Sequence, residues 1–466
     1  MNKILLSLAV ISGLSLSTFA DEIEDMKVQI DTLTKKLSKL EKKQKRTQKT
    51  LSKVRMHDAF DNIKFGLDVR TAVDVIDYKN NKTGVEAANH SLISNRLYLT
   101  MKSSPMSGLT FTGKLAVYDV WGSELFVDDA PLKTWSASSK PGDTVMRVKE
   151  AYFVYTTAMG EQPISISVGR RPSTNGFLSN YRENESTAGS PLAHITNMEV
   201  DAAMAKLSWS RFVEGAYTKF VYGRAHAGAH ENVYGTGSSY GFSTPYALEN
   251  SDDDPVDFFL MLGDAYNNGQ HQIMYEWAHI FNTKGKRVAD PLPAVNKSLA
   301  AGTADLAAIS YKMDGVGDEI SDFLDSTVLF ASVAMTNYNA KEGYSLLGST
   351  DGGSKRGYSY WVGALFPDMI TEDGKIGLEF NHGSEFWTPM TWAEDTAIGS
   401  KMAVRGNAYE AYWNFNLFGV KYLPSQIRYT YVQHDYTPNI NCAGWVAPEI
   451  VDITSQDIRM SVSYRY

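Results

Sequence analysis

The chain contains a segment whose apolar and polar residues alternate one by one. Ile458, Met460, Val462, Tyr464 and Tyr466 are separated by charged or hydroxyl-bearing residues. A period of two is typical of a β-strand with one apolar and one polar face. The same alternation recurs along most of the chain, and it predicts sixteen strands. They are expected near residues 63–70, 96–101, 109–117, 147–157, 164–171, 200–210, 217–225, 256–265, 271–281, 303–313, 326–337, 357–366, 375–384, 403–415, 425–435 and 455–466.

The connections between these strands alternate between long and short. The long ones include 77–92, 119–146, 172–199 and 226–255, and the short ones 103–108, 158–163, 211–216 and 266–270. Up-and-down barrels of the outer membrane are built in this way. Because no segment after residue 20 approaches the ~18 consecutive apolar residues of a transmembrane helix, a membrane protein must here be a barrel. The pattern therefore predicts an all-β transmembrane β-barrel of about 16 antiparallel strands over residues 58–466.

The first 57 residues have a different pattern. Residues 1–20 combine Lys3, an apolar run and Thr18-Phe-Ala20, which is typical of a secretory signal peptide. Residues 21–57 repeat apolar residues with 3-4 spacing, which predicts an α-helical coiled coil before the barrel. Its core positions are Ile23, Met26, Ile30, Leu33, Leu37, Leu40, Gln44, Thr47, Leu51 and Val54.

The strict heptad spacing favours self-association of this helix over packing of a lone helix on the barrel. Ile and Leu are mixed at the core positions, which leaves the number of helices open, and three are preferred by analogy with trimeric porins. We therefore expect a homotrimer whose coiled coil lies in the periplasm.

Composition agrees with a barrel. The chain has 26 Tyr, 9 Trp and 36 Gly, with 43% hydrophobic residues, as expected when only alternate strand residues face lipid. The single cysteine, Cys442, excludes an internal disulfide framework. Tyr464 and Tyr466 resemble the C-terminal signal that the barrel-insertion machinery of Gram-negative bacteria recognises, although the last residue there is usually Phe. An ordinary amphipathic strand of a soluble protein is the alternative for this segment.

The polar faces of the strands predict the character of the lumen. The expected pore-lining residues are mixed in sign: Arg96, Lys114, Glu150, Arg171, Glu379, Glu410, Arg428, Arg459 and Arg465. Such a lining suits water and small solutes and argues against a channel for hydrophobic ligands. The loop 172–199 stands where general porins fold a loop inward. Its Arg182, Glu183 and Glu185 are candidates for a constriction with a transverse field, or else for ordinary charges on an outer loop.

Metal and catalytic motifs are weak. His226 and His230 precede Glu231, but zincins require a helix with Glu after the first His. Acidic residues gather in connections at Glu249, at 252–254 and at 314–325, which points to a modest cation preference or to divalent-ion bridging; a solvated acidic loop is the simpler interpretation of 252–254. No metal site, cofactor, nucleic-acid partner or enzyme activity is expected, and a barrel enzyme with a hidden Ser-His pair is the less favoured alternative.

Three segments carry a family resemblance: Glu150-Ala-Tyr-Phe-Val-Tyr155, Gly169-Arg-Arg-Pro172 and Gly377-Leu-Glu-Phe-Asn-His-Gly-Ser384 with Phe386-Trp387. They resemble a family of campylobacterial outer-membrane proteins with a conserved domain of unknown function. The resemblance implies an outer-membrane barrel and supplies no substrate. The order of coiled coil and barrel is also similar to phosphate-selective porins, but no arginine or lysine ladder is visible in the sequence, so their selectivity is not carried over.

These observations predict an outer-membrane porin through which ions and small hydrophilic solutes diffuse passively. The alternative is a structural anchor, embedded in outer-membrane lipid, whose basic coiled coil reaches the peptidoglycan. Deletion of residues 21–57 separates the two hypotheses, since a porin should still conduct without them.

Overall fold

The computed structural model describes residues 63–121, 126–127, 130–131, 146–160, 162–171, 174–226, 255–289, 299–317, 320–371, 373–391, 395–438 and 446–466. The predicted signal peptide (1–20) and coiled coil (21–57) lie outside the described residues. Residues Ile63–Tyr466 form one compact unit. Among the described residues, no helix has the length and apolar character needed to cross a membrane.

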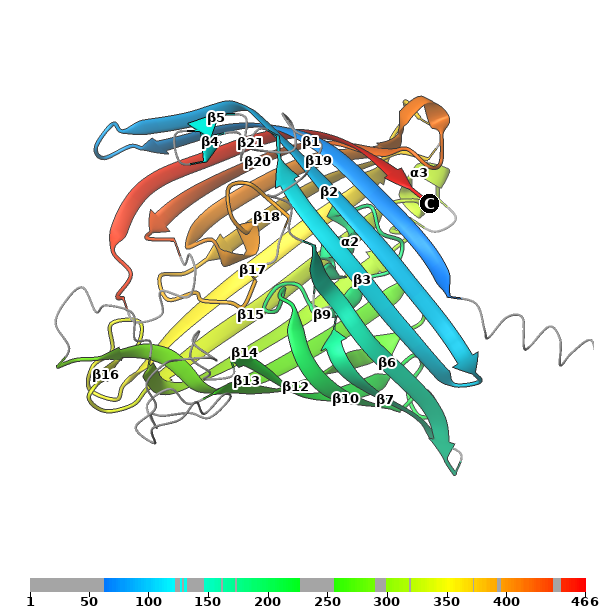
Figure 1. Ribbon diagram of the computed structural model, residues 1–466, viewed down its shortest axis with the longest axis horizontal. Helices are drawn as coiled ribbons and strands as arrows, with labels where there is room; N and C mark the ends of the chain where they lie inside the picture. Colours follow the sequence, from blue (N-terminus) through cyan, green and yellow to red (C-terminus); the bar gives the residue numbers. More distant parts are fainter. Residues whose placement is uncertain are drawn as a thin grey trace, which may run out of the picture. The chain divides into compact units, whose positions relative to one another are not determined.

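Sixteen antiparallel strands form a closed barrel (Figure 1). They are β1 (Lys64–Asn80), β2 (Glu86–Met106), β3 (Leu109–Val120), β6 (Arg147–Met159), β7 (Gln162–Arg171), β10 (Val200–Ser208), β11 (Tyr217–His226), β12 (Val256–Asn267), β13 (His271–Arg287), β14 (Leu299–Asp314), β15 (Val328–Ala340), β17 (Ser354–Pro367), β18 (Lys375–Gly383), β19 (Gly406–Asn416), β20 (Pro424–Tyr436) and β21 (Ile450–Arg465). Each strand pairs with the next, and β1 pairs with β21 to close the ring.

The remaining elements are short. They are β4 (Phe126–Val127), β5 (Ala130–Pro131), β8 (Gly176–Phe177), α2 (Ser179–Arg182), β9 (Gly189–Leu192), α3 (Asp322–Asp325), β16 (Tyr344–Ser345), η1 (Lys401–Ala403) and η2 (Leu417–Gly419). β4 pairs with β5, β8 pairs with β9, and β16 pairs with the end of β13.

The predicted fold class is confirmed for the barrel, with one correction. The connection 77–92, expected to be a long loop, is mostly strand: β1 and β2 continue their pairing to Lys79 and Glu86, with a bulge after Asp74. The sequence prediction stopped early because Asn, Lys and His residues break the apolar alternation there. These residues face solvent on both sides of an extended hairpin, so neither face has to be apolar and no alternation results.

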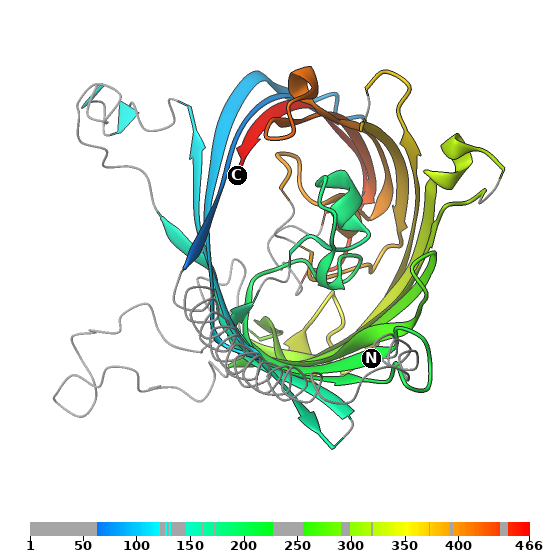
Figure 2. The ribbon, with the colours of Figure 1, turned by 90° about the vertical axis from the view of Figure 1, so that its right-hand side faces the viewer.

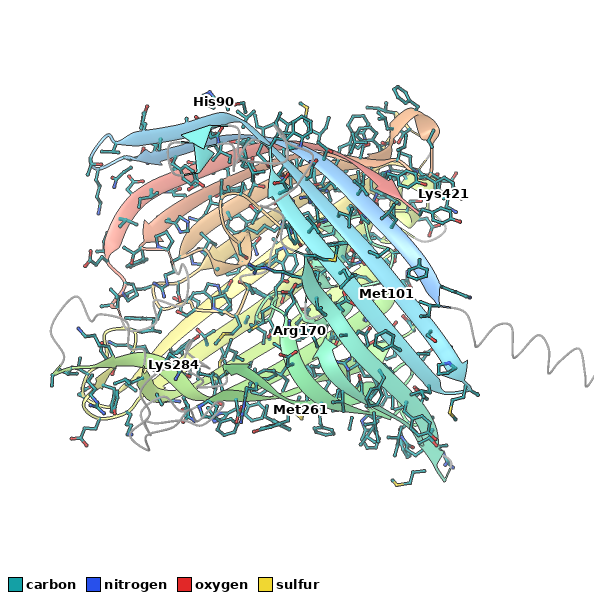
Figure 3. The ribbon with its side chains drawn as sticks, viewed as in Figure 1. His90, Met101, Arg170, Met261, Lys284 and Lys421 are labelled. Atoms are coloured by element: carbon teal, nitrogen blue, oxygen red, sulfur yellow. The ribbon has the colours of Figure 1, made fainter. Side chains whose placement is uncertain are left out.

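The two faces of the barrel wall differ in polarity. On β21 the side chains of Ile458, Met460 and Val462 are exposed on the outside, whereas Asp457 and Arg459 are buried inside. Met101 and Met261 likewise lie on the outer side of β2 and β12 (Figure 3). A soluble protein would bury the apolar face, so this wall is suited to an apolar surrounding.

The tight turns lie at one end of the barrel and the longer connections at the other (Figure 1). Gly108 in the turn between β2 and β3 has a φ of 81°. A Cβ at this position would approach the carbonyl oxygen of Thr156 to 2.4 Å, so only glycine fits. The tight turn therefore depends on this residue.

Two of the long connections fold into the barrel (Figure 2). The first, residues 174–199, carries α2; the second, of which residues 384–391 and 395–405 are described, precedes β19. Both pack into an apolar cluster with the inner faces of β10 to β17. Large buried side chains of this cluster are Leu306 and Trp361 from the strands, Leu192 and Ile195 from the first loop, and Trp387 and Met402 from the second. The sequence analysis named only polar inward residues, whereas the strands on this side are apolar inside where the two loops cover them.

Candidate channel constriction

The first inward loop is held by strand side chains that accept from or donate to its backbone. Glu276 on β13 accepts hydrogen bonds from the Leu192 amide at 2.7 Å and the Thr196 hydroxyl at 2.8 Å. At the other end of the loop, the Asn414 side chain donates to the carbonyl oxygen of Tyr181 at 2.9 Å. Gln426 likewise donates to the Arg182 carbonyl oxygen at 2.5 Å. The loop is thus fixed to opposite parts of the wall.

His194 fixes the middle of this loop. Its two ring nitrogens lie 2.7 Å from the Ser332 hydroxyl and 2.9 Å from the Ser359 hydroxyl, and its ring packs against Trp361 and Trp387. Complete burial lowers the pKa of His194 to about 3. The imidazole is therefore neutral at physiological pH and acts as a hydrogen-bonded part of the packing.

The second inward loop pairs with the first. The Met390 amide donates to the Ile195 carbonyl at 2.9 Å, and the Asn197 amide donates to the Met390 carbonyl at 2.7 Å. The Trp387 indole donates to the Met402 carbonyl at 2.7 Å. The sequence analysis assigned this loop no inward path, although its Trp387, Met390 and Met402 are an apolar signal that a solvated loop does not need.

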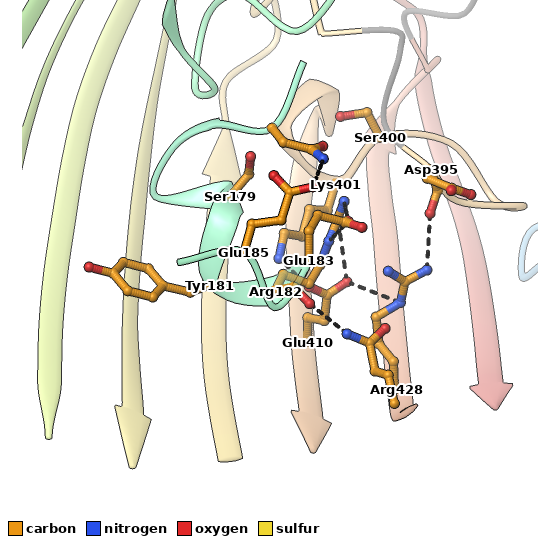
Figure 4. Close-up of polar contacts among 12 residues, drawn as sticks. Ser179, Tyr181, Arg182, Glu183, Glu185, Asp395, Ser400, Lys401, Glu410 and Arg428 are labelled. Carbon is orange, nitrogen blue, oxygen red and sulfur yellow. Dashed lines mark hydrogen bonds and ion pairs between the residues drawn. The ribbon is translucent and has the colours of Figure 1, made fainter. Parts of the chain in front are cut away.

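A buried network of charges joins the two loops to the wall (Figure 4). The ammonium group of Lys401, from the second loop, contacts Glu379 at 2.6 Å and also Glu410. Arg182 from the first loop and Arg428 from β20 each lie 3.9 Å from a Glu410 oxygen. Glu379 on β18 thereby receives its counter-charge from the second loop, whereas Glu410 on β19 is approached by cations from both loops and from the neighbouring strand β20.

One aspartate of the second loop is surrounded by arginines. The Asp395 carboxylate contacts Arg70 at 2.6 Å, Arg96 at 3.0 Å and Arg459 at 3.2 Å. Its backbone carbonyl oxygen accepts from Arg428 at 3.2 Å and from Arg459 at 2.9 Å. These arginines stand on four consecutive strands, β20, β21, β1 and β2. The structure thus contains an arginine row that the sequence did not reveal, because the pairing of β1 with β21 is needed to bring its halves together.

A cavity of about 440 Å³ remains between the first loop and the wall of β1, β2, β3 and β6. Its charged and aromatic lining consists of Asp68, Arg96, Tyr98, Lys114, Tyr118, Lys149, Glu183, Glu185, Asp395, Arg465 and Tyr466. Glu183 and Glu185 come from the loop, while the cationic groups come from the wall. The cavity therefore has an acidic side and a mainly basic side.

Of the predicted pore-lining residues, the structure places Arg96, Lys114 and Arg465 at this cavity. Glu150 lies behind it as the ion-pair partner of Lys114. Arg171 does not line the cavity; it lies over the Tyr152 ring, with its guanidinium carbon 5.1 Å from the ring centroid. The other four, Glu379, Glu410, Arg428 and Arg459, face inward but are buried in the charge networks.

Lys149 is a lining residue that the sequence did not indicate. It is buried and paired with Glu199, although the neighbouring Glu150 also points inward. Strict alternation would send one of two consecutive residues outward. A bulge opposite Lys114 and Leu115 breaks the alternation and turns both side chains to the inside.

The acids of the first loop differ in their pairing. Glu183 contacts the Arg182 guanidinium at 2.6 Å. Glu185 accepts a hydrogen bond from the Asn175 amide at 3.1 Å. Burial, together with the charge of Glu183, raises the pKa of Glu185 above its ordinary value. Glu185 is therefore the acid of this loop that becomes neutral first when the pH falls.

The structure describes some of the remaining residues that the sequence analysis singled out, and others lie outside the described residues. Within the described ranges, no group of three or more His, Asp, Glu or Cys side chains is arranged to hold a metal ion. His226 ends β11, whereas His230, Glu231, Cys442 and the acidic residues 249–254 lie outside the described residues. Tyr464 and Tyr466 are exposed; the Tyr466 ring lies 6.4 Å from that of Tyr422, and Tyr466 also borders the cavity.

A comparison with family models finds one match, a protein of unknown function (DUF3373), over residues 86–464. The match covers more than three quarters of the chain. The chain belongs to the DUF3373 family. The expected resemblance to a family with a conserved domain of unknown function is confirmed to this extent, while a campylobacterial origin and a likeness to phosphate-selective porins are not shown.

Solved structures similar to this DUF3373 protein include three bacterial channels. An anion-selective porin from Comamonas acidovorans has 11% identity and a TM-score of 0.47, with 87% of this chain and 99% of that chain covered. OprB of Pseudomonas putida has 12% identity and a TM-score of 0.47, with 89% and 96% covered. The outer membrane channel DcaP of Acinetobacter baumannii has 12% identity and a TM-score of 0.42, with 87% and 97% covered. A comparison with curated proteins finds no match.

Proposed function

We propose that the protein is an outer-membrane porin through which ions and small hydrophilic solutes diffuse passively. The observation that carries this proposal is the combination of an apolar outer wall with a closed barrel whose interior holds a charged cavity. An apolar exterior fits lipid, and a charged, partly open interior fits hydrated solutes. The proposed location is the outer membrane of a Gram-negative bacterium.

The loop-side acids and wall-side bases of the cavity act as a constriction with a transverse field in this proposal. Glu183 and Glu185 form the acidic side, and Arg96, Lys114, Lys149 and Arg465 form the basic side. With Asp68 and Asp395 included, the four acidic and four basic residues of the cavity have no net formal charge, so ion selectivity depends on where the charges lie.

The test is single-channel recording of the purified protein in a planar bilayer. We expect stepwise ohmic openings and a finite reversal potential under a salt gradient. Openings in groups of three would support the homotrimer that the predicted coiled coil suggests. A silent bilayer containing demonstrably folded protein would contradict the diffusion hypothesis and favour a closed barrel that serves as an anchor.

Glu185→Gln tests the acidic side of the constriction. One unit charge about 6 Å from an ion in water contributes about 0.7 kcal/mol, which is about threefold for each ion. Its loss disfavours the cation and favours the anion, so we expect the cation-to-anion permeability ratio to fall about tenfold. The reversal potential under a KCl gradient measures this ratio. Glu86→Gln, in the exposed hairpin, is the matched control.

The same residue predicts a pH dependence. The pKa of Glu185 is raised above 4.5, so Glu185 becomes neutral at a higher pH than an ordinary glutamate does. As the pH is lowered, we therefore expect the cation preference of the wild type to begin to decrease above pH 4.5. The Glu185→Gln variant should lack this part of the titration. A variant that titrates like the wild type would show that another acid controls the selectivity.

A further inference from the structure

The arginine cluster, defined as Arg70, Arg96, Arg428 and Arg459, is an unusual concentration of like charge. In the strand register Arg70 stands opposite Arg96, and Arg428 stands opposite Arg459. Each side chain is no more than 9% exposed. Like charges directly across a strand pair destabilise a sheet. The cluster must therefore be stabilised by nearby anions.

Asp395 is the anion that three of the four arginines share: its carboxylate contacts Arg70, Arg96 and Arg459, whereas Arg428 donates to its backbone carbonyl oxygen. Arg70 donates through both terminal nitrogens to the two carboxylate oxygens, at 2.6 and 3.1 Å. This two-pronged arrangement is the geometry in which guanidinium groups recognise carboxylates in general. The neighbouring arginines hold the pKa of Asp395 well below its ordinary range, although burial alone would raise it. The carboxylate is thus ionised when it occupies the cluster.

The cluster has hydrogen-bond donors in excess of what it uses. Arg459 also contacts Asp74, and Arg96 also contacts Asp68 at 3.2 Å. The Nε atoms of Arg70, Arg96 and Arg428 are nevertheless buried without a hydrogen-bond partner in the described part of the chain. Buried donors without partners cost free energy. The Asp395 side chain therefore does not supply enough hydrogen-bond acceptors for all the donors of the cluster.

The cluster is also accessible from the candidate constriction. Arg96 and Asp395 both belong to the lining of the 440 Å³ cavity, next to Arg465 and Lys114. The Tyr98 ring supports the Arg96 guanidinium, whose carbon lies 4.4 Å from the ring centroid. A small solute in the cavity thus meets the cluster at the edge where Asp395 is bound.

We propose that the arginine cluster is a binding site for a small organic acid that carries a carboxylate, and that Asp395 occupies the site as an intramolecular substitute. The solute's carboxylate would replace that of Asp395 on Arg70 and Arg96, and its remainder would lie in the cavity. Competition with a tethered carboxylate lowers the apparent affinity, which suits a solute that must also leave. The inference deepens the proposed function, since it names a class of solute for the same lumen.

A purely structural role of the cluster is the competing explanation. In that case Asp395 only fastens the second loop, and its removal loosens the loop without creating affinity for any solute. The two explanations differ in the expected effect of an uncharged replacement that keeps the side-chain shape. Asp395→Asn retains one oxygen acceptor but leaves the cluster with one negative charge fewer.

The experiment measures succinate binding to the folded, detergent-solubilised protein by isothermal titration calorimetry. Relative to the wild type, we expect Asp395→Asn to bind succinate about tenfold more tightly, because it removes the competing carboxylate. Neutral succinamide is the ligand control and should not bind. Asp351→Asn is the matched protein control, since Asp351 lies in an exposed turn and bonds only within it. Equal affinity of the wild type and Asp395→Asn would overturn the proposal.

A second variant keeps the test decisive if Asp395→Asn does not fold. Arg96→Gln in the otherwise wild-type chain should abolish succinate binding. The proposal would be overturned if Arg96→Gln bound succinate as tightly as the wild type does. It would also be overturned if the wild type did not bind succinate at all. The failure of the porin hypothesis is recognised separately. If the folded protein binds succinate but never conducts, the proposed binding site stands and only the porin hypothesis is contradicted.

Discussion

Replacing Lys401 by methionine lowers the free energy of unfolding by about 3–5 kcal/mol, the usual effect of leaving buried charges without their partner. Lys401 is 2% exposed and contacts both Glu379 and Glu410. Methionine fills a similar volume but leaves the two carboxylates facing each other. Glu410 keeps Arg182 and Arg428 at 3.9 Å, so most of the destabilisation originates at Glu379.

Equilibrium unfolding in urea, followed by tryptophan fluorescence in lipid vesicles, measures this effect. Trp361 is a suitable reporter because its indole donates to Glu379 at 2.8 Å. The double variant Lys401→Met with Glu379→Gln should recover part of the loss, since it removes the charge that lacks a partner. Lys421→Met, in an exposed turn, is the control. A loss below about 1 kcal/mol, as for a surface ion pair, would contradict the assigned burial.

Replacing Val333 by arginine destabilises the barrel in lipid by about 2–4 kcal/mol, the range for a cation on the lipid face near the bilayer midplane. Val333 is 60% exposed and lies in the middle of β15, opposite Ile309 on one neighbour and Tyr360 on the other. The substitution places a guanidinium group in the apolar outer band. In a soluble barrel the same change at so exposed a position would have almost no effect.

Ile320→Arg provides the matched comparison. Ile320 is 75% exposed, but it lies in the turn before α3 rather than on the barrel wall. We expect its effect on the free energy of unfolding in vesicles to be within about 0.5 kcal/mol, as for other surface substitutions. Equal effects of the two variants would show that β15 does not face lipid.

The strands were predictable because each has to satisfy two different surroundings. β21 illustrates this, since its apolar residues from Ile458 to Tyr464 occupy one face without interruption. The polar residues between them set the register, because a slip of one residue would move Arg459 to the outer face. The sequence pattern is therefore strong wherever both faces are constrained.

The interior was less predictable because it is made by contacts between distant segments. The side-chain alternation places Glu379 and Glu410 inside, but their partner Lys401 lies in a loop whose path no periodicity records. Likewise, the convergence of Arg70 and Arg459 on Asp395 follows from barrel closure and from the inward path of the second loop. The ion-pair partners that lie on loops can therefore be identified only from the three-dimensional structure.

Local departures from regularity explain the remaining differences. The bulge in the pairing of β3 with β6 turns Lys149 inward, against the alternation. On the opposite wall, inward residues such as Leu260 and Leu306 are apolar because the two inward loops cover them. In such a strand both faces are apolar, one toward lipid and the other toward a packed loop. The polarity of a residue therefore does not show which of the two faces it occupies.

The pairing of β1 with β21 joins the first and last strands of the barrel, with partners from Asp68 with Arg465 to Asn80 with Ile453. This seam cannot form until every intervening hairpin is present, so the ring is completed in a single late step that spans almost the whole barrel. Until then both strands present open edges that can pair with other chains. The two edges that must be kept from pairing with other chains are therefore β1 and β21, until they pair with each other.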